Sequence, residues 1–171
     1  MDLSELVAEI KKIPLKVKLD TNGMVPLALK ALFGREETSP DYIAIDLKMS
    51  PERYGELLPP GEAFDPAAML RTSAQLIHES GISHEYRTLV LPAVNGQGGF
   101  IGEEDIEALA PLVDDAPWYF RPFFGGNCLD PAWDALGGPL GNNKAAASKS
   151  LAMLLVEKAI ALGKNASSPL L

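Results

Sequence analysis

The chain has 171 residues, a length that allows one domain with a substantial core. Hydrophobic residues make up 47% and charged residues 22%, which is typical of a globular protein in water. The 15 basic and 23 acidic side chains give a formal charge of -8, which argues against broad binding to nucleic acid or to anionic membranes. The single cysteine, Cys128, excludes an intrachain disulfide and an all-cysteine metal site.

Apolar runs and histidine spacing indicate where the protein is located and whether it binds zinc. No apolar run approaches the roughly 18 to 20 residues that a membrane span needs, and the first residues form an acidic amphipathic segment unlike a signal peptide. We therefore expect a cytoplasmic protein. The two histidines, His78 and His84, flank a predicted helix end without ligand spacing, so the sequence does not predict a zinc site.

The first half of the chain alternates predicted helices with predicted strands. Residues 2–12 have apolar residues at helical spacing and end before Pro14. A strand over 15–20 leads into the turn 21–23, and a helix over 25–33 follows with Pro26 in its first turn. Residues 41–48 read Asp-Tyr-Ile-Ala-Ile-Asp-Leu-Lys, an almost uninterrupted apolar run that indicates a parallel strand covered on both faces.

The alternation continues in the second half. Residues 51–57 are predicted to form one helical turn, and the helix over 66–80 has Asp65 as N-cap and Gly81 past its end. A strand over 85–91 is followed by the glycine-rich segment 95–99, which we interpret as a connector rather than a lip over a ligand. An acidic helix over 102–115, an aromatic strand over 118–124 and a short helical turn over 130–136 complete the series.

The predicted fold is therefore α/β. Right-handed crossovers place about four parallel strands in sequence order, which forms an arc with open edges, an incomplete (β/α) barrel. We assign 1–136 to this partial barrel, 137–143 to a linker, 144–163 to a C-terminal helix and 164–171 to a disordered tail.

Charged side chains appear where the central strand ends. Asp46 and Lys48 follow the apolar run, and Arg87 lies on the next strand. In open α/β sheets and in barrels, ligands sit beyond the carboxyl ends of the strands, so this group is a candidate site. The plain alternative is a solvated strand end without function.

Several motifs together resemble a known family. They are Leu19-Asp-Thr-Asn-Gly23, Asp41-Tyr-Ile-Ala-Ile-Asp-Leu-Lys48, Tyr86-Arg-Thr-Leu-Val-Leu-Pro92, Phe120-Arg-Pro-Phe123 and Leu129-Asp-Pro131. In this order they resemble the later half of radical S-adenosylmethionine (SAM) activating enzymes, which include the activating proteins of anaerobic ribonucleoside-triphosphate reductase and of pyruvate formate-lyase. The resemblance covers roughly Leu3 to Trp133.

The resemblance implies an activity and a set of contacts. Enzymes of this family bind a [4Fe-4S] cluster and SAM, cleave SAM reductively to a 5′-deoxyadenosyl radical, and abstract a glycine hydrogen from a partner glycyl radical enzyme. By resemblance, the SAM contacts here are Asp46, Lys48, Arg87, Thr21 and Asn22. A carboxylate, two cations and small polar groups suit the ammonium, carboxylate and hydroxyl groups of SAM.

The chain departs from the family at the cluster. The Cys-x3-Cys-x2-Cys loop and the Gly-Gly-Glu-Pro segment are missing, and Cys128 alone does not supply three thiolates. We therefore expect no catalytic residue, no bound metal and no radical chemistry from this chain alone. The leading hypothesis is the C-terminal part of an activase, as a domain, a truncated reading frame or one half of a split protein.

Two other hypotheses remain open. One is a non-catalytic half barrel that binds another protein across its open edge. The other is a small α/β enzyme that uses Asp46, Lys48 and Arg87 on an anionic metabolite. Because open edges and an apolar inner barrel surface would be uncovered, we also expect association into at least a dimer, unless the C-terminal helix covers one edge.

Overall fold

A computed structural model describes residues 2–57, 64–90, 101–123 and 142–169. The elements in chain order are α1 (Leu3–Lys11), β1 (Lys18–Thr21), α2 (Pro26–Leu32), β2 (Tyr42–Asp46), the 3-10 helix η1 (Pro51–Leu57), α3 (Pro66–Ser80), β3 (His84–Val90), α4 (Glu103–Leu109), the 3-10 helix η2 (Ala110–Leu112), β4 (Trp118–Pro122), α6 (Asn142–Ala161) and β5 (Ala166–Ser167). Cys128, the glycine-rich segment 95–99 and the predicted helical turn 130–136 lie outside the described residues.

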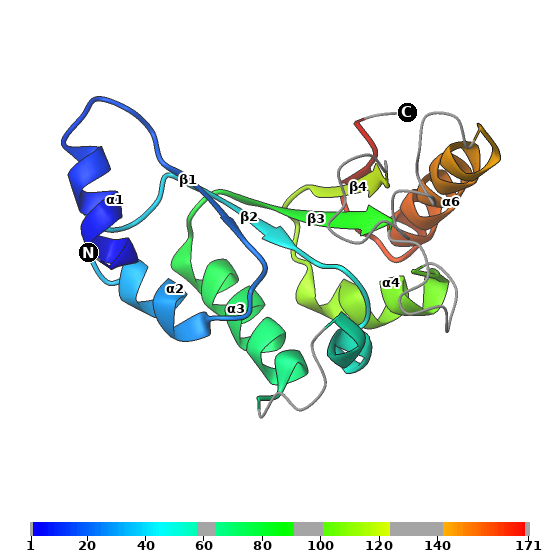
Figure 1. Cartoon of the computed structure of the whole chain (residues 1–171), viewed down its shortest axis with the longest axis horizontal. Coiled ribbons are helices and arrows are strands. Elements are labelled where there is room, and N and C mark those ends of the chain that lie inside the picture. Colours follow the sequence, from blue (N-terminus) through cyan, green and yellow to red (C-terminus); the bar gives the residue numbers. More distant parts are fainter. Residues whose placement is uncertain (1, 58–63, 91–100, 124–141, 170–171) are drawn as a thin grey trace.

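The five strands form one parallel sheet in the order β1-β2-β3-β4-β5. Figure 1 shows α2, α3 and α4 on the same side of this sheet, with α1 near its β1 end and α6 near β4. Right-handed crossovers between strands in sequence order place all connecting helices on one side. The predicted α/β fold, an open arc consistent with an incomplete (β/α) barrel, is confirmed.

The end of the chain differs from the prediction. Residues 164–171 were expected to be disordered, but Ala166 and Ser167 form β5 beside β4. The Trp118 N–H donates to the Asn165 carbonyl (2.8 Å), and Lys164 Nζ donates to the Val113 carbonyl (2.6 Å). These contacts to β4 and to the end of η2 order the segment. The sheet therefore has a fifth strand in place of an open β4 edge.

The two faces of the sheet differ in chemistry because side chains alternate along each strand. The helix-covered face is apolar, and its fully buried side chains include Ile43, Ile45, Tyr86, Trp118 and Phe120. The opposite face carries Lys18, Asp20, Asp46, Glu85 and Arg87. We call it the open face.

The open face is charged, whereas the sequence analysis predicted an apolar inner surface. We expected an apolar inner barrel surface and a central strand covered on both faces. In the described part of the chain the open face carries charged side chains instead. The continuous apolar run of β2 arises because Ala44, which points to this face, pairs with Asp20 and Glu85 and is fully buried among longer side chains.

The turn after β1 is fixed by tertiary contacts. Gly23 has φ of 74°, a conformation that favours glycine, and an added Cβ would lie 3.1 Å from Leu70 Cδ1. Its carbonyl accepts a hydrogen bond from Ser73 Oγ (2.7 Å) on α3. The carboxyl end of β1 is thereby held against α3. None of the described helices is long and apolar enough to cross a membrane.

Candidate functional site

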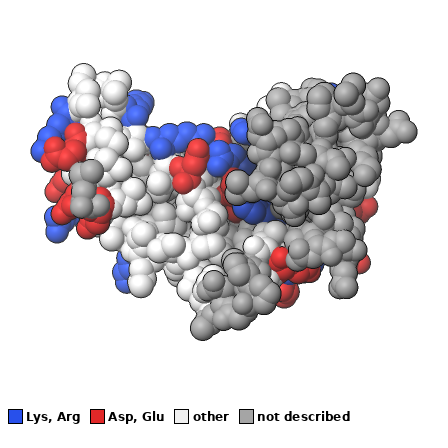
Figure 2. All heavy atoms as spheres, in the orientation of Figure 1, with Lys and Arg blue, Asp and Glu red and all other residues white. Residues whose placement is uncertain are grey.

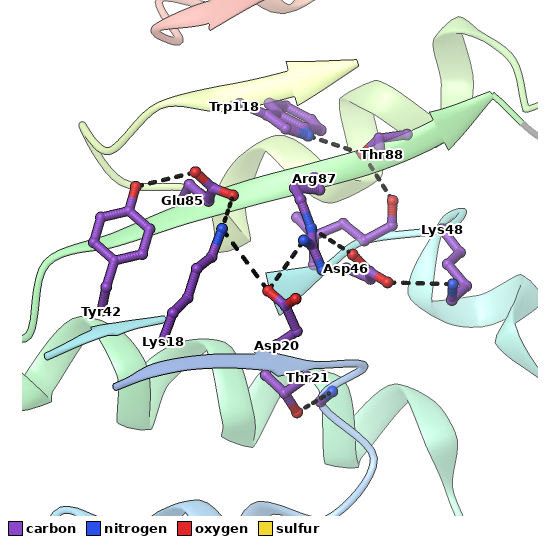
Figure 3. A network of polar contacts seen from close by, with 12 residues as sticks. Lys18, Asp20, Thr21, Tyr42, Asp46, Lys48, Glu85, Arg87, Thr88 and Trp118 are labelled. Atoms are coloured by element: carbon purple, nitrogen blue, oxygen red, sulfur yellow. Dashed lines mark hydrogen bonds and ion pairs between the residues drawn. The ribbon is translucent and has the colours of Figure 1, made fainter. Parts of the chain in front are cut away.

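Charged side chains gather on the open face along β1, β2 and β3 and just after β2. The register brings them together, because Asp46 pairs with Arg87 across β2 and β3, and Asp20 lies on β1 beside Ala44. Figure 2 shows basic and acidic atoms side by side in the saddle between the two ends of the molecule, and Figure 3 shows the contacts. We call Lys18, Asp20, Asp46, Lys48, Glu85 and Arg87 the rim network.

Arg87 is the centre of the rim network. Its Nε donates to Asp46 Oδ1 (2.9 Å), and its Nη1 lies 3.1 Å from Asp20 Oδ1. The guanidinium therefore joins carboxylates from both neighbouring strands. Its side chain is only 15% exposed, so these charges are less screened by water than ordinary surface pairs. The planar fork of an arginine suits this double contact, because two separate nitrogens reach the two carboxylates.

Asp46 also faces Lys48. Their side chains are about one third exposed, and Lys48 Nζ lies 3.5 Å from Asp46 Oδ2, which is the long limit of a hydrogen bond. The Lys48 ammonium thus keeps donors for another acceptor, and Asp46 Oδ2 keeps capacity for another donor. Asp46, Lys48 and Arg87, which the sequence analysis named as candidate site residues, therefore lie together in the structure.

A second set of contacts extends the rim network towards the amino ends of the strands. Lys18 Nζ donates to Glu85 Oε1 (3.0 Å) and lies 3.9 Å from Asp20 Oδ1. The Tyr42 hydroxyl donates to Glu85 Oε2 (3.1 Å). Burial, together with this hydrogen bond to the Glu85 carboxylate, raises the pKa of Tyr42 to about 12, so the phenol stays protonated at neutral pH.

The charges of the rim network balance, with three cations and three carboxylates. A simple anion such as phosphate would approach Arg87 between two carboxylates, whose negative charge would repel it. A zwitterion with an ammonium and a carboxylate fits better, because both charge types are already present side by side.

No known family model matches this chain, and no curated protein matches it.

Thr21 and Asn22, predicted as further contacts, are placed differently from the other three. The Thr21 hydroxyl accepts the Gly23 N–H (3.1 Å), and Asn22 Oδ1 accepts the Met24 N–H (3.0 Å). Figure 3 shows Thr21 on the other side of β1 from Asp20. Both side chains thus stabilise the turn at the same rim, and the structure does not bring Thr21 to Arg87.

Sequence reasoning missed Lys18, Asp20 and Glu85. The available signal was the alternation of side chains, which puts Lys18 and Asp20 on one face of β1 and Glu85 and Arg87 on one face of β3. The register between the strands, which makes these residues neighbours, was not available from the sequence. The candidate site is therefore larger than the predicted one and includes its own counterions.

A separate polar cluster lies at the opposite, amino-terminal end of the sheet. Asp114 Oδ2 lies 2.7 Å from His78 Nδ1 and 3.0 Å from His84 Nε2, so the two histidines share one carboxylate despite their lack of sequence spacing. Burial opposes ionisation of Asp114, but the contacts with His78, the Ala116 N–H and His84 lower its pKa overall. Among the described residues, no group of three potential ligands is arranged to hold a metal ion.

Proposed function

We propose that this chain is the C-terminal, SAM-binding part of a radical SAM activating enzyme for a glycyl radical enzyme. The observation that carries the proposal is the position of Arg87 between two carboxylates at the carboxyl ends of adjacent parallel strands, with Lys48 beside it. The parallel sheet, with its strands in sequence order and its connecting helices on one side, also supports the proposal, because a (β/α) barrel has this arrangement. The ordered motifs described above supply the family.

The amino-acid end of SAM is the part of the ligand that the rim network fits. Asp46 Oδ2 would accept from the SAM ammonium, and Lys48 Nζ would donate to its carboxylate. Arg87 holds Asp46 in place through Nε and so orients the acceptor. A ligand with one charge of each sign would leave the three-to-three balance of the rim network unchanged, so it would not leave an unpaired charge behind.

The [4Fe-4S] cluster does not fit this chain. A cluster with one open iron needs three thiolates, and the sequence has one cysteine. The chain's part in the reaction is therefore to bind and orient the amino-acid end of SAM. Reductive cleavage and hydrogen abstraction belong to a complete enzyme in which a separate N-terminal half supplies the cluster, acting on an anaerobic ribonucleotide reductase or a pyruvate formate-lyase type partner.

Calorimetric titration of the purified chain with SAM tests the proposal. We expect weak but saturable binding of SAM, weaker binding of L-methionine, and still weaker binding of inorganic phosphate. Lys48→Met and Asp46→Asn should each reduce SAM affinity about tenfold, the effect of losing one charged contact of ~1.4 kcal/mol. Lys30→Met, on the last turn of α2, is the matched control and should not change it.

Equal affinity of wild type and both site variants for SAM would refute the assignment of the rim network. Phosphate binding tighter than SAM binding would instead favour the small enzyme that acts on an anionic metabolite. A second test adds a candidate N-terminal half with the Cys-x3-Cys-x2-Cys motif and asks whether the two chains co-elute.

A second candidate function is a non-catalytic half barrel that binds another protein. It is favoured by four exposed apolar side chains beside β1, which pairs only with β2 in the described sheet. Ile13 and Leu15 precede β1, and Val25 and Leu27 follow it, with 53% to 79% of each exposed. An open strand edge with apolar flanks is a common protein-binding surface.

The oligomeric state separates this candidate from an isolated ligand-binding domain. If the β1 edge pairs with a second copy, light scattering gives at least a dimer, and Leu15→Asp and Leu27→Asp should both dissociate it. The control is Met153→Asp, which changes another exposed apolar residue on α6, at the other end of the sheet. A monomer at high concentration would count against self-association at this edge.

A further inference from the structure

The backbone that carries Asp46 and Lys48 is held by a tyrosine outside the sheet. Tyr54, on η1, is 3% exposed. Its hydroxyl donates to the Asp46 carbonyl (3.2 Å) and accepts the Lys48 N–H (2.8 Å). One buried side chain thus contacts the main chain of both predicted ligand-binding residues.

The residue between them is held from the other side. The Leu47 N–H donates to the Arg87 carbonyl (2.7 Å), and the Leu47 carbonyl accepts from Thr88 Oγ1 (2.7 Å) on β3. Thr88 Oγ1 also accepts the Trp118 Nε1–H (2.9 Å). Four main-chain groups where the chain leaves β2 therefore have protein partners, although regular sheet pairing ends at Asp46.

The Tyr54 hydroxyl can play both roles only as a neutral phenol. It must keep its proton to donate to Asp46 and keep a lone pair to accept from Lys48. Burial is the main cause that raises the pKa of Tyr54, and the nearby Asp46 carboxylate raises it further. We call the two hydrogen bonds of the Tyr54 hydroxyl, to the Asp46 carbonyl and from the Lys48 N–H, the clamp. Because the phenol keeps its proton at neutral pH, the clamp does not titrate in the neutral range.

We propose that Tyr54 is a positioning residue for the rim network. In an extended backbone, residues two apart point to the same side, so fixing the main chain from Asp46 to Lys48 keeps both side chains directed to the same face. The 3.5 Å approach of Lys48 Nζ to Asp46 Oδ2 depends on this geometry. The ligand-binding consequence rests on the proposed function, whereas the clamp itself does not.

The substitution Tyr54→Phe removes the hydroxyl and keeps the ring that packs in the core. The first readout is amide hydrogen exchange by NMR. The Lys48 amide should exchange at least about tenfold faster, the effect of losing a hydrogen bond of ~1.4 kcal/mol, while the Leu47 amide, bonded to Arg87, should change less. Tyr119→Phe on β4 is the matched control and should leave both amides unchanged.

The second readout is a comparison of two ligands. Because the clamp acts on the amino-acid end, Tyr54→Phe should weaken SAM binding about tenfold and leave 5′-methylthioadenosine, which lacks that end, unchanged. Equal losses for both ligands would mean a general structural effect and would overturn the positioning role. An unchanged Lys48 amide would overturn the clamp.

The two readouts distinguish a failure of the proposed function from a failure of the positioning role of Tyr54. If the wild type binds no SAM, the proposed function fails, and the hydrogen-exchange result still decides whether Tyr54 fixes the end of β2. If SAM binds and Tyr54→Phe binds it equally well, the proposed function stands and the positioning role is refuted.

Discussion

Removing the guanidinium of Arg87 is the sharpest test of the rim network. Arg87→Met keeps the aliphatic stem and removes both ion pairs. The pair with Asp46, whose side chain is 32% exposed, should contribute about 1 kcal/mol, and the pair with Asp20, which is 59% exposed, about 0.5 kcal/mol. The expected loss of about 1.5 kcal/mol corresponds to a fall in Tm of about 3–6 °C for a chain of this size.

The assay is thermal unfolding at low salt and in 1 M NaCl. Because the Debye length is about 3 Å in 1 M salt, the difference between Arg87→Met and wild type should shrink by about half. Arg121→Met, an exposed arginine on β4, is the matched control and should stay within about 0.5 kcal/mol of wild type. A loss that does not depend on salt would show that Arg87 acts through packing, and no loss at low salt would refute the electrostatic argument.

Three further predictions concern the stability of the folded chain. Gly23→Ala should destabilise the protein by about 2 kcal/mol in urea unfolding, because it adds close contacts to the strain of a positive φ. Gly163→Ala, at φ of 78° in open space, should cost only about 1 kcal/mol. Asp105→Ala should cost about 3 kcal/mol or more, because this buried carboxylate accepts from the Ser50 and Gly102 amides and from Arg53. The Asp114 pKa is lower in the folded state, so its stabilisation is present above the unfolded pKa and is lost as pH falls through the folded pKa. Wild type should therefore lose more stability than Asp114→Asn between pH 5 and pH 3.

The sequence predicted the fold where local signals and tertiary structure agree. The helix with N-cap Asp65 and Gly81 past its end was predicted with its observed bounds, because both caps are local features. The strand order followed from the alternation of elements and the handedness of crossovers. The two-residue strand β5 was missed, because it has no periodicity of its own and is ordered by contacts to β4.

The candidate site was predicted only in part, because some of its residues have a local signal in the sequence and others do not. Asp46 and Lys48 stand out because they end an apolar run, and Arg87 because it is a charge within a strand. Asp20 depends on strand register, and Tyr54 depends on the path of η1 back towards β2, which no local pattern encodes. Sequence reasoning thus located the rim and missed the groups that neutralise and orient it.

The order of the strands determines which parts of the sheet unfold locally first. Since each of the described strands pairs only with described strands next to it in sequence, the sheet resembles a one-dimensional array in which each unit is stabilised mainly by its immediate neighbours. The central strand, β3, has two long partners, whereas β1 has one and β5 is held by two residues. Opening should therefore proceed inward from the edges, and amide protection should rise towards β3. The strand that carries Arg87 is then the last to lose its structure, and its immediate partner, β2, carries Asp46.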